Sequence, residues 1–389
     1  RFIAVSKTHL NLARKLKSFQ MTEKKFMSLA YDLAKRGQYT AKPGVNVGCV
    51  IVKKGKIIGQ GWYEKYGGRH AEVNAINSVK RRYPKSYEHA LSNSSIYVSL
   101  EPCSTHGKTP PCVDELKKYS FKEVVIGDKD KSQNGIKELK KAGLKVKELN
   151  LNDLKTNQGF LKKVNLKRPY VRAKIAMSKD GKISFRNNRN KWITSKASRK
   201  DAHHYRAISD LVVTGTGTLL KDNPSLNVRD RNITKHKSFK QPDKSVVGNS
   251  LKDLKDLKFF KDKVKKIVFT SRKKNLPNMN RLINTEVKIL NKSGSKLDLV
   301  SFLNKIEKMG YKEILIEAGP KLLTSFIKAD LIDEFIVYIA PKMLSNTADS
   351  FFEGPSSLNP LKSKKYKIIE STKIGIDKKL IYRKKQKWD

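Results

Sequence analysis

The sequence predicts an α/β protein with two domains, and three observations support that prediction. The chain has 389 residues, more than a single hydrophobic core usually organises. Strand-like and helix-like patterns alternate along its first part, stop at a polar stretch, and then begin again. Such alternation is typical of layered α/β domains. We therefore expect a first α/β domain over residues 21–150, a linker over 151–167 and a second α/β domain over 168–389.

The first domain is expected to begin with a helix and a hairpin. Apolar residues recur at helical spacing between Glu23 and Arg36, which predicts a helix there. The segment VGCVIVKKGKIIGQGW predicts two strands around a Lys-Gly turn. The elements expected after them are a helix over HAEVNAINSVKRR, a strand over SSIYVSLEPC that ends at Cys103, a helix that starts near Cys112, a strand over KEVVIGD, and a helix and a strand over GIKELKKAGLKVKEL.

The second domain is expected to start after Arg168-Pro169, where the alternation resumes. Its predicted elements are a strand over YVRAKIAMS, a helix over SRKDAHHYRAI, strands over DLVVTG and KKIVFTS, and a strand–helix–strand unit over KEILIEAGPKLLTSFIKADLIDEFIVYIAP. The tract from Asp230 to Lys258 contains few apolar residues, and we expect it to be a loop.

Composition limits the class of protein. Hydrophobic residues make up 38% of the chain, which is lean but sufficient for folded domains. No apolar run approaches the roughly 18 residues of a membrane span, so we expect a soluble protein with no membrane partner. Three cysteines are few and odd in number, which argues against a disulfide framework. We expect free thiols and a reducing, cytoplasmic compartment.

The net charge of +48 has two explanations. Lys and Arg neutralise phosphates, so a nucleic-acid partner would account for it. The charge is spread along the whole chain and is mostly Lys, however, and a genome-wide preference for Lys, Asn and Ile would give the same value. We favour the second explanation and expect no specific nucleic-acid partner, because net charge reports on solubility and non-specific binding more than on function.

Residues 1–20 are basic and contain no acidic residue, and a natural-looking start, MTEKKFMSLAYDLAKRG, begins at Met21. One explanation is an amphipathic transit peptide. We favour an extension upstream of a misplaced start, or an artificial addition, and leave the three alternatives open.

The strongest chemical pattern combines His70, Glu72, Cys103 and Cys112. Zinc-dependent deamination needs three protein ligands, an open position for water, and an acid that moves protons without binding the metal. His70 and Glu72 begin one predicted helix, and Cys112 begins another, where the helix dipole favours a thiolate. We predict His70, Cys103 and Cys112 as the zinc ligands and Glu72 as the catalytic residue that relays a proton to the departing ammonia.

Each of these residues alone would be unremarkable. A single His beside Glu is usually structural, and a buried Cys usually belongs to the core. The combination of H-A-E, a strand, and then P-C and P-C at the start of a helix is much harder to obtain by chance. Cys49, in the predicted strand VGCVIV, is by contrast expected to be a core residue.

Two glycine patterns in the second half of the chain are candidate nucleotide-binding sites. VVTGTGTLL begins as G-x-G, but Leu220 stands where a dinucleotide fingerprint has its third Gly, so the pattern fails. Gly319 and Pro320 open a helix whose free N–H groups could hold a phosphate. An ordinary strand-to-helix turn with Pro at the first helical position explains the second pattern equally well.

The metal pattern resembles the cytidine-deaminase-like superfamily, whose second motif is usually P-C-x-x-C. Here the cysteines are wider apart, in PCSTHGKTPPC, and this form resembles the bifunctional riboflavin-biosynthesis deaminase/reductase family. VGCVIV, HAEVNAI and LEPC extend the match in the first half. KRPYVRAKIAMSKDGKI, NKWITS, HHYRAISD, TGTLLKDNPSLNVR, ILIEAGPKLL and DEFIVYIAPK resemble the reductase domain of the same family. The resemblance covers roughly residues 22–389 and is weakest from Asp230 to Leu299.

The resemblance implies a fold, two reactions and two cofactors. The first domain would be a cytidine-deaminase-like three-layer domain that deaminates 2,5-diamino-6-ribosylamino-4(3H)-pyrimidinone 5′-phosphate with Zn²⁺. The second would be a dihydrofolate-reductase-like domain that reduces the ribosyl group of the product to ribityl with NADPH. The partners expected are this small phosphorylated pyrimidine and further copies of the chain in a homo-oligomer.

The resemblance also places the contacts of the second domain. Cofactor contacts fall on Trp192, Thr218, Asp222, Ser250, and the turn formed by Gly319, Pro320, Lys321, Leu322, Leu323, Thr324 and Ser325. Substrate contacts fall on Asn190, Arg206, Leu226, Arg229 and Glu317. The two arginines suit a sugar phosphate through bidentate contacts. Lys174 and Glu317 lie in or just after apolar strands, where burial perturbs pKa, and are candidates for proton transfer to the sugar carbonyl oxygen.

The chain departs from the family around the first site. Gly44-Val45 stands where the family has Asn-Pro, with Asn46 next in the chain, and Thr105 replaces a common His. The segment DKDKSQNG replaces a loop that normally contains Asp-Pro-Asn-Pro. Lys108 stands where the family expects a basic residue and is a further candidate contact.

Two other hypotheses remain at this level. A nucleic-acid-editing deaminase would explain the charge, but it requires a groove with stacking aromatic residues, and no basic segment is interleaved with aromatic residues beyond chance. A monofunctional deaminase with a degenerate reductase domain would retain the second half only for dimerisation. The presence of Trp192, Asp222 and Glu317 argues against that hypothesis.

Overall fold

The structure is a computed structural model of the chain, which falls into two compact units, Arg1–Val164 and Asn165–Asp389. It describes residues 23–151, 157–160, 167–184, 192–250, 254, 256–272, 282–294, 296–344, 348–355 and 359–385. The segment 1–20 and the candidate Asn190 lie outside the described residues. Among the described residues, no helix is long and apolar enough to cross a membrane.

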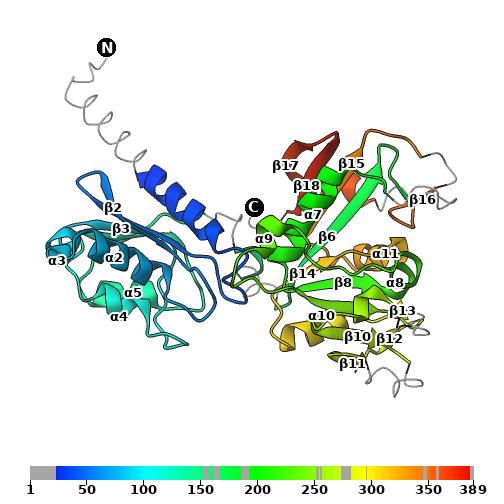
Figure 1. Cartoon of the computed structure of the whole chain (residues 1–389), viewed down its shortest axis with the longest axis horizontal. Helices are drawn as coiled ribbons and strands as arrows, with labels where there is room; N and C mark the ends of the chain where they lie inside the picture. The colour runs from blue at the N-terminus through cyan, green and yellow to red at the C-terminus, as the bar shows by residue number, and fades with distance from the viewer. Residues whose placement is uncertain are drawn as a thin grey trace, which may run out of the picture. The chain divides into compact units, whose positions relative to one another are not determined.

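The first unit is built on a five-stranded sheet with the order β2-β1-β3-β4-β5 (Figure 1). β1 pairs antiparallel with both β2 and β3, whereas β3, β4 and β5 run parallel. The strands are β1 (Gly48–Lys53), β2 (Lys56–Trp62), β3 (Ser95–Leu100), β4 (Glu123–Asp128) and β5 (Val146–Glu148). The helices are residues 23–36, α2 (Ala71–Arg82), α3 (Tyr87–Leu91), α4 (Cys112–Leu116) and α5 (Gly135–Lys141).

Helices cover both faces of this sheet, because the strands are apolar on both sides. Alternate residues of a strand point to opposite faces. Val50 and Val52 accordingly pack with the helix over residues 23–36, whereas Cys49 and Ile51 pack with α2. The three-layer arrangement is therefore confirmed, and Cys49 is a fully buried core residue as expected. β3 ends at Leu100, three residues earlier than predicted, since the chain turns away from the sheet before Cys103.

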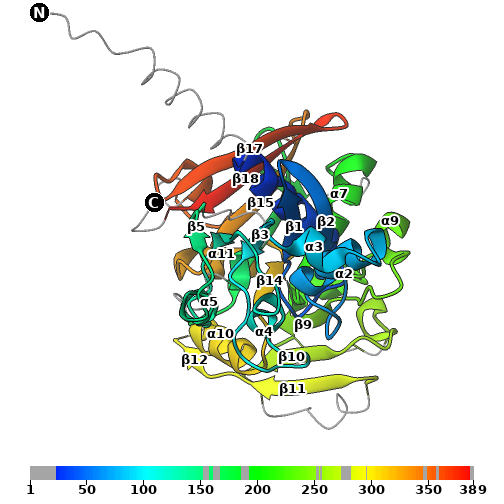
Figure 2. The ribbon, with the colours of Figure 1, turned by 90° about the vertical axis from the view of Figure 1, so that its left-hand side faces the viewer.

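The second unit is built on a nine-stranded sheet with the order β11-β10-β9-β8-β14-β6-β15-β18-β17. β11 forms one edge, and β17 and β18 form a long antiparallel pair at the other (Figure 2). The strands are β6 (Tyr170–Ser178), β8 (Leu211–Gly215), β9 (Asp243–Val247), β10 (Lys266–Thr270), β11 (Thr285–Ile289), β14 (Glu313–Ile316), β15 (Glu334–Ala340), β17 (Tyr366–Ile374) and β18 (Asp377–Lys384). Two short pairs, β7 (Lys182–Ser184) with β16 (Asp349–Ser350) and β12 (Lys292–Ser293) with β13 (Lys296–Leu297), lie outside this sheet.

Five α-helices of the second unit are described: α7 (Lys196–Ile208), α8 (Thr216–Asp222), α9 (Arg231–Thr234), α10 (Leu299–Lys308) and α11 (Pro320–Lys328). The largest core of the unit gathers apolar residues of β6, β8, β14 and β15 with those of α10 and α11. The unit thus buries its mainly parallel strands beneath helices, as parallel sheets require.

The expectation of a loop from Asp230 to Lys258 is wrong. This tract contains α9 and the strand β9, which lies inside the sheet between β8 and β10. The sequence of β9 is DKSVV, and its lysine lowered the apparent hydropathy of the segment. Lys244 is nevertheless only 1% exposed, because its charge is neutralised inside the fold.

Two candidate active sites

The first candidate site is a cradle of one imidazole and two thiols. His70 directly precedes α2, and Cys112 is the first residue of α4. The Nδ1 atom of His70 lies 3.1 Å from Sγ of Cys112 and 3.4 Å from Sγ of Cys103. All three donor atoms lie within 4.8 Å of one another. One nitrogen and two sulfurs at this spacing form the donor set of a catalytic zinc site with a fourth, open position.

Glu101 positions the cysteine loop. After β3 ends, its carboxylate accepts hydrogen bonds from the backbone N–H groups of Asp130, at 3.1 Å, and Ile136, at 3.0 Å. These bonds tie the segment before Cys103 to the start of α5. At Gly135 a Cβ atom would lie only 1.9 Å from the carbonyl oxygen of Pro102, so only glycine fits there. The Glu of LEPC therefore has a structural explanation that sequence reasoning missed.

The two cysteines have opposite pKa shifts, because each affects the ionisation of the other. Sγ of Cys103 accepts a hydrogen bond from the thiol of Cys112 and a further one from His70, and these lower the pKa of Cys103 to about 4. The same contact with Cys103 raises the pKa of Cys112, and burial adds to the rise. The surroundings therefore favour the thiolate form of Cys103 over that of Cys112. A metal held by both sulfurs would also displace the proton of Cys112, which is the usual coupling of metal binding to thiol ionisation.

Thr109 and Tyr63 fix the ring of His70. Oγ1 of Thr109 lies 3.2 Å from Nε2 of His70, on the side of the ring away from the sulfurs. Tyr63 contacts the same ring edge to face, with centroids 5.2 Å apart. When Nε2 donates to Oγ1 of Thr109, the resulting tautomer leaves Nδ1 able to coordinate a metal in place of its contacts with the sulfurs. Thr109 belongs to the GKTPPC sequence, but the sequence alone did not indicate its contact with His70.

Glu72 is the second residue of α2 and is only 3% exposed. Burial raises the pKa of Glu72, and the negative charge of Cys103 adds to that effect. A carboxyl group in this environment holds a proton more readily than one in water. Its placement suits the transfer of a proton rather than permanent ionisation.

In two segments where the chain departs from the family pattern, side-chain amides form hydrogen bonds with the backbone. The amide of Asn157 donates to the carbonyl of Asn46 and accepts from its N–H, both at 2.8 Å. Oε1 of Gln133, from the divergent segment, accepts from the N–H of Ser104 at 2.9 Å, directly after Cys103. The Nζ atom of Lys108 lies 4.3 Å from the ring centroid of Tyr66. Gln133 thus ties this segment to the cysteine loop.

The second candidate site begins where α8 and α11 start beside each other (Figure 1). The N–H of Gly319 donates to Oγ1 of Thr218 at 2.7 Å, so the structure brings these two predicted cofactor residues together. Gly319 and Pro320 do open a helix, with Pro320 at its first position.

Of the other turn residues, Leu323 and Thr324 are buried, while Lys321 is exposed at the helix start. Leu322 packs against Gly215, and Ser325 donates to the carbonyl of Lys321.

The other predicted cofactor residues are more exposed. Trp192 is 55% exposed, and the guanidinium of Arg199 lies over its ring at 4.7 Å. Asp222 is the last residue of α8, and Ser250 follows β9; both are exposed. Their assignment to the cofactor stays a prediction.

A buried carboxylate organises the predicted substrate residues. Glu317 accepts two hydrogen bonds from the guanidinium of Arg206, through Nε at 2.5 Å and Nη2 at 3.0 Å. The Nζ atom of Lys174 lies 3.0 Å from its second oxygen. Burial alone would raise the pKa of Glu317, but the two cations outweigh burial and lower it well below its usual range. Glu317 is therefore a fixed anion.

This arrangement changes the expected role of Arg206. The resemblance predicts bidentate contacts from two arginines to a sugar phosphate. The guanidinium of Arg206, however, already makes a bidentate contact with Glu317 through Nε and Nη2. Its Nη1 donates to the carbonyl of Asn227 at 3.0 Å. Among the described residues, Arg229 donates to the hydroxyl of Ser225 and, through its backbone N–H, to His203. Arg229 is thus the better placed of the two for an anionic group.

Comparison with known proteins identifies the family. The model of the RibD C-terminal domain matches residues 169–380, and that of the cytidine and deoxycytidylate deaminase zinc-binding region matches residues 20–128. The chain belongs to the RibD family. The riboflavin biosynthesis protein RibD of Buchnera aphidicola is 37% identical over 378 residues, which cover 92% of this chain and 98% of the relative. The RibD protein of Escherichia coli is 31% identical with the same coverage of both chains.

Solved structures agree over the full length. Form 1 of Acinetobacter baumannii RibD superposes with a TM-score of 0.81 at 32% identity and covers 94% of this chain and 99% of its own. The Thermotoga maritima deaminase/reductase gives a TM-score of 0.78 at 30% identity, with the same coverage. The cytidine-deaminase-like and reductase folds are therefore confirmed, as are a zinc-dependent deaminase and an NADPH-dependent reductase of riboflavin biosynthesis. A nucleic-acid-editing enzyme and a degenerate second domain are correspondingly disfavoured.

Proposed function

We propose that residues 21–150 and 168–389 act as consecutive catalytic domains. The first deaminates 2,5-diamino-6-ribosylamino-4(3H)-pyrimidinone 5′-phosphate, and the second reduces the ribosyl group of the product, giving 5-amino-6-ribitylamino-uracil 5′-phosphate. The observation that carries this proposal is the cradle of His70, Cys103 and Cys112 on the same chain as a RibD reductase domain. The related Thermotoga protein bears the name of both activities.

In the deaminase reaction, His70, Cys103 and Cys112 would hold the zinc ion. Zinc there would supply an activated water for attack on the amino-bearing ring carbon. Glu72 would carry a proton from water to the leaving nitrogen, so that water and the amine become a carbonyl and ammonia. Thr109 keeps His70 oriented during the reaction. Lys108 is a candidate contact to the substrate.

In the reductase reaction, the turn from Gly319 to Ser325 at the start of α11 and the nearby Thr218 would hold the phosphates of NADPH. NADPH would supply the hydride for C1 of the sugar. Lys174, fixed by Glu317, donates a hydrogen bond to the sugar oxygen that gains the charge. Trp192, Asp222 and Ser250 complete the cofactor contacts, and Asn190, Leu226 and Arg229 those of the substrate.

The test uses the full chain loaded with zinc. The diaminopyrimidine nucleotide is supplied, and ammonia release and NADPH oxidation are followed in turn. We expect ammonia first and NADPH oxidation only after it. Absence of ammonia from a protein that contains stoichiometric zinc would contradict the deaminase assignment, and ammonia without NADPH oxidation would contradict the reductase assignment.

We also propose that the protein works as a cytoplasmic homo-oligomer without a nucleic-acid partner. Support for self-association comes from β17, the last strand of the large sheet, where Ile368 and Ile369 are 54% and 39% exposed. An edge strand with exposed isoleucines favours pairing with another chain. Light scattering after size-exclusion chromatography measures the oligomeric state, and a monomer at micromolar concentration would contradict this part of the proposal.

A further inference from the structure

The segment Ser225–Arg229, which we call the substrate loop, has a strained backbone. Leu226 has a φ angle of 55° and is only 4% exposed. A branched, apolar residue rarely adopts this left-handed conformation, and it persists only where neighbouring groups hold it. Strain of this kind is concentrated at ligand-binding positions. The groups that hold the substrate loop are therefore worth identifying.

Two residues, Gln241 just before β9 and Lys244 within it, hold the substrate loop from one side. The side-chain amide of Gln241 both donates to the carbonyl of Val228 and accepts from its N–H, each at 2.8 Å. The Nζ atom of Lys244 donates to the carbonyl of Ser225 at 2.8 Å. We call Gln241 and Lys244 the β9 clamp. Its contacts flank Leu226, so they fix the backbone on both sides of the strained residue.

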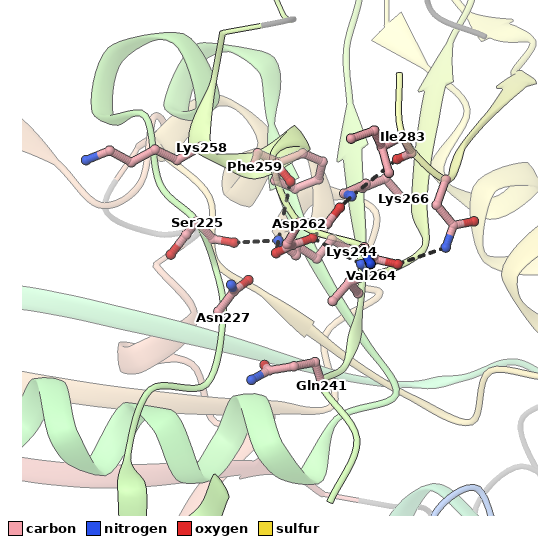
Figure 3. A network of polar contacts seen from close by, with 12 residues as sticks. Ser225, Asn227, Gln241, Lys244, Lys258, Phe259, Asp262, Val264, Lys266 and Ile283 are labelled. Carbon is pink, nitrogen blue, oxygen red and sulfur yellow. Dashed lines mark hydrogen bonds and ion pairs between the residues drawn. The ribbon is translucent and has the colours of Figure 1, made fainter. Parts of the chain in front are cut away.

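The ammonium group of Lys244 is fully used and almost fully buried. Besides Ser225, it donates to the carbonyl of Phe259 at 3.3 Å and to the carboxylate of Asp262 at 2.5 Å (Figure 3). Burial lowers the pKa of Lys244, and Asp262 offsets part of that effect. Burial would raise the pKa of Asp262, but Lys244, Lys266 and the amide of Asn227 together lower it. A buried ion pair of this kind is costly unless every donor is satisfied.

A second buried lysine provides the natural comparison. Lys266, on the neighbouring strand β10, is paired in register with Lys244 and is 0% exposed. It contacts Oδ1 of Asp262 at 3.1 Å and donates to the carbonyl oxygens of Asp262 and Ile283. Lys266 therefore shares the carboxylate and the burial of Lys244, but these bonds are directed to Asp262 and Ile283 and not to the substrate loop.

We propose that Lys244, held by Asp262 and assisted by Gln241, is a positioning residue of the reductase that fixes the substrate loop in the conformation that presents the backbone at Leu226 and the side chain of Arg229 to the phosphorylated sugar. This inference rests on the proposed substrate role of Leu226 and Arg229. Because Lys244 acts through the loop and not on the reacting atoms, its loss changes substrate affinity more than the rate of hydride transfer.

The experiment compares Lys244→Met with Lys266→Met in the full-length chain. We expect Lys244→Met to raise the reductase KM for the phosphorylated aminouracil by about 10-fold or more, with kcat reduced less than about 3-fold. Lys266→Met should change the same KM by less than about 2-fold at a comparable loss of thermal stability. The deaminase kcat/KM, measured on the same preparations, is the internal control and should not change. Lys244→Arg should restore most of the substrate affinity.

The proposal is overturned if Lys244→Met leaves the KM unchanged, or if Lys266→Met raises it equally. Should Lys244→Met fail to fold, Gln241→Met tests the same clamp from a half-buried position, and an unchanged KM in that variant overturns the proposal as well. Failure of the proposed function is recognised separately, because the wild-type protein would then not oxidise NADPH with this substrate at all.

Discussion

Two buried glutamates, one in each candidate site, have opposite electrostatic environments. Glu72 and Glu317 are 3% and 7% exposed, so burial disfavours the charged form of both. The pKa of Glu72 is raised because burial dominates, whereas that of Glu317 is lowered because Arg206 and Lys174 outweigh burial. Burial alone therefore does not fix the protonation state of a carboxyl group. Here the two cations beside Glu317 make the difference, which fits the roles proposed for the two groups: a proton carrier at Glu72 and a fixed anion at Glu317.

The largest expected effect tests the proton-carrier half of this comparison. Glu72→Gln keeps the shape and burial of the side chain but cannot relay a proton, so the deaminase kcat should fall by about 10²- to 10⁴-fold. Zinc content and reductase activity should be retained, and both serve as controls. Deaminase activity within about 3-fold of wild type would remove Glu72 from its assigned role.

The variant Glu317→Gln tests whether Glu317 is a fixed anion that holds Arg206 and Lys174. This change leaves the cations of Arg206 and Lys174 without their partner, and breaking a buried ion pair costs about 3 kcal/mol or more. We expect a lower unfolding free energy of the second unit in urea, together with loss of reductase activity. Glu72→Gln should not destabilise the protein comparably, since the part of the chain that the structure describes places no such pair of cations beside Glu72. Equal destabilisation by both variants would contradict the comparison.

A smaller effect is expected in the zinc cradle at Thr109. Thr109→Val removes the hydroxyl at Nε2 of His70, and loss of such an outer contact typically weakens metal binding by about 10-fold or more. Competition with a chromophoric chelator measures the affinity directly, independent of turnover. Thr109→Ser is the matched control and should bind zinc like the wild type. An unchanged affinity in Thr109→Val would show that Tyr63 and the backbone suffice to orient the ring.

The smallest effect concerns His203, beside the substrate loop. Burial and the positive charges of Arg206 and Arg229 lower the pKa of His203 to about 4. Because this value lies below that of an unfolded histidine, His203 contributes stability above about pH 6.5 that is lost progressively as the pH falls toward 4. Urea unfolding of wild type and His203→Gln across this range should show a shallower pH dependence for the variant. Parallel pH profiles would argue against a neutral, half-buried His203.

The deaminase site was accessible to sequence reasoning, whereas much of the second site was not. His70, Glu72 and Cys112 stand at helix starts, and Cys103 follows a strand end, so a local pattern already implied convergence. Thr109 belongs to the motif GKTPPC and Glu101 to LEPC, but their hydrogen-bond partners lie on other segments of the chain. The hydrogen bonds that define their roles could not be inferred from spacing.

The sequence by itself determined the two α/β domains, the residue types of the zinc cradle, and the helix that opens at Gly319 and Pro320. These features depend on short-range periodicity and on motifs of a few residues. Only the tertiary structure decided that Arg206 is occupied by Glu317, and that Lys244 lies in a buried strand where a solvated loop was expected. The physical reason is that a charged side chain is buried only when distant residues supply its counterion and acceptors, and those contacts leave no mark on local sequence.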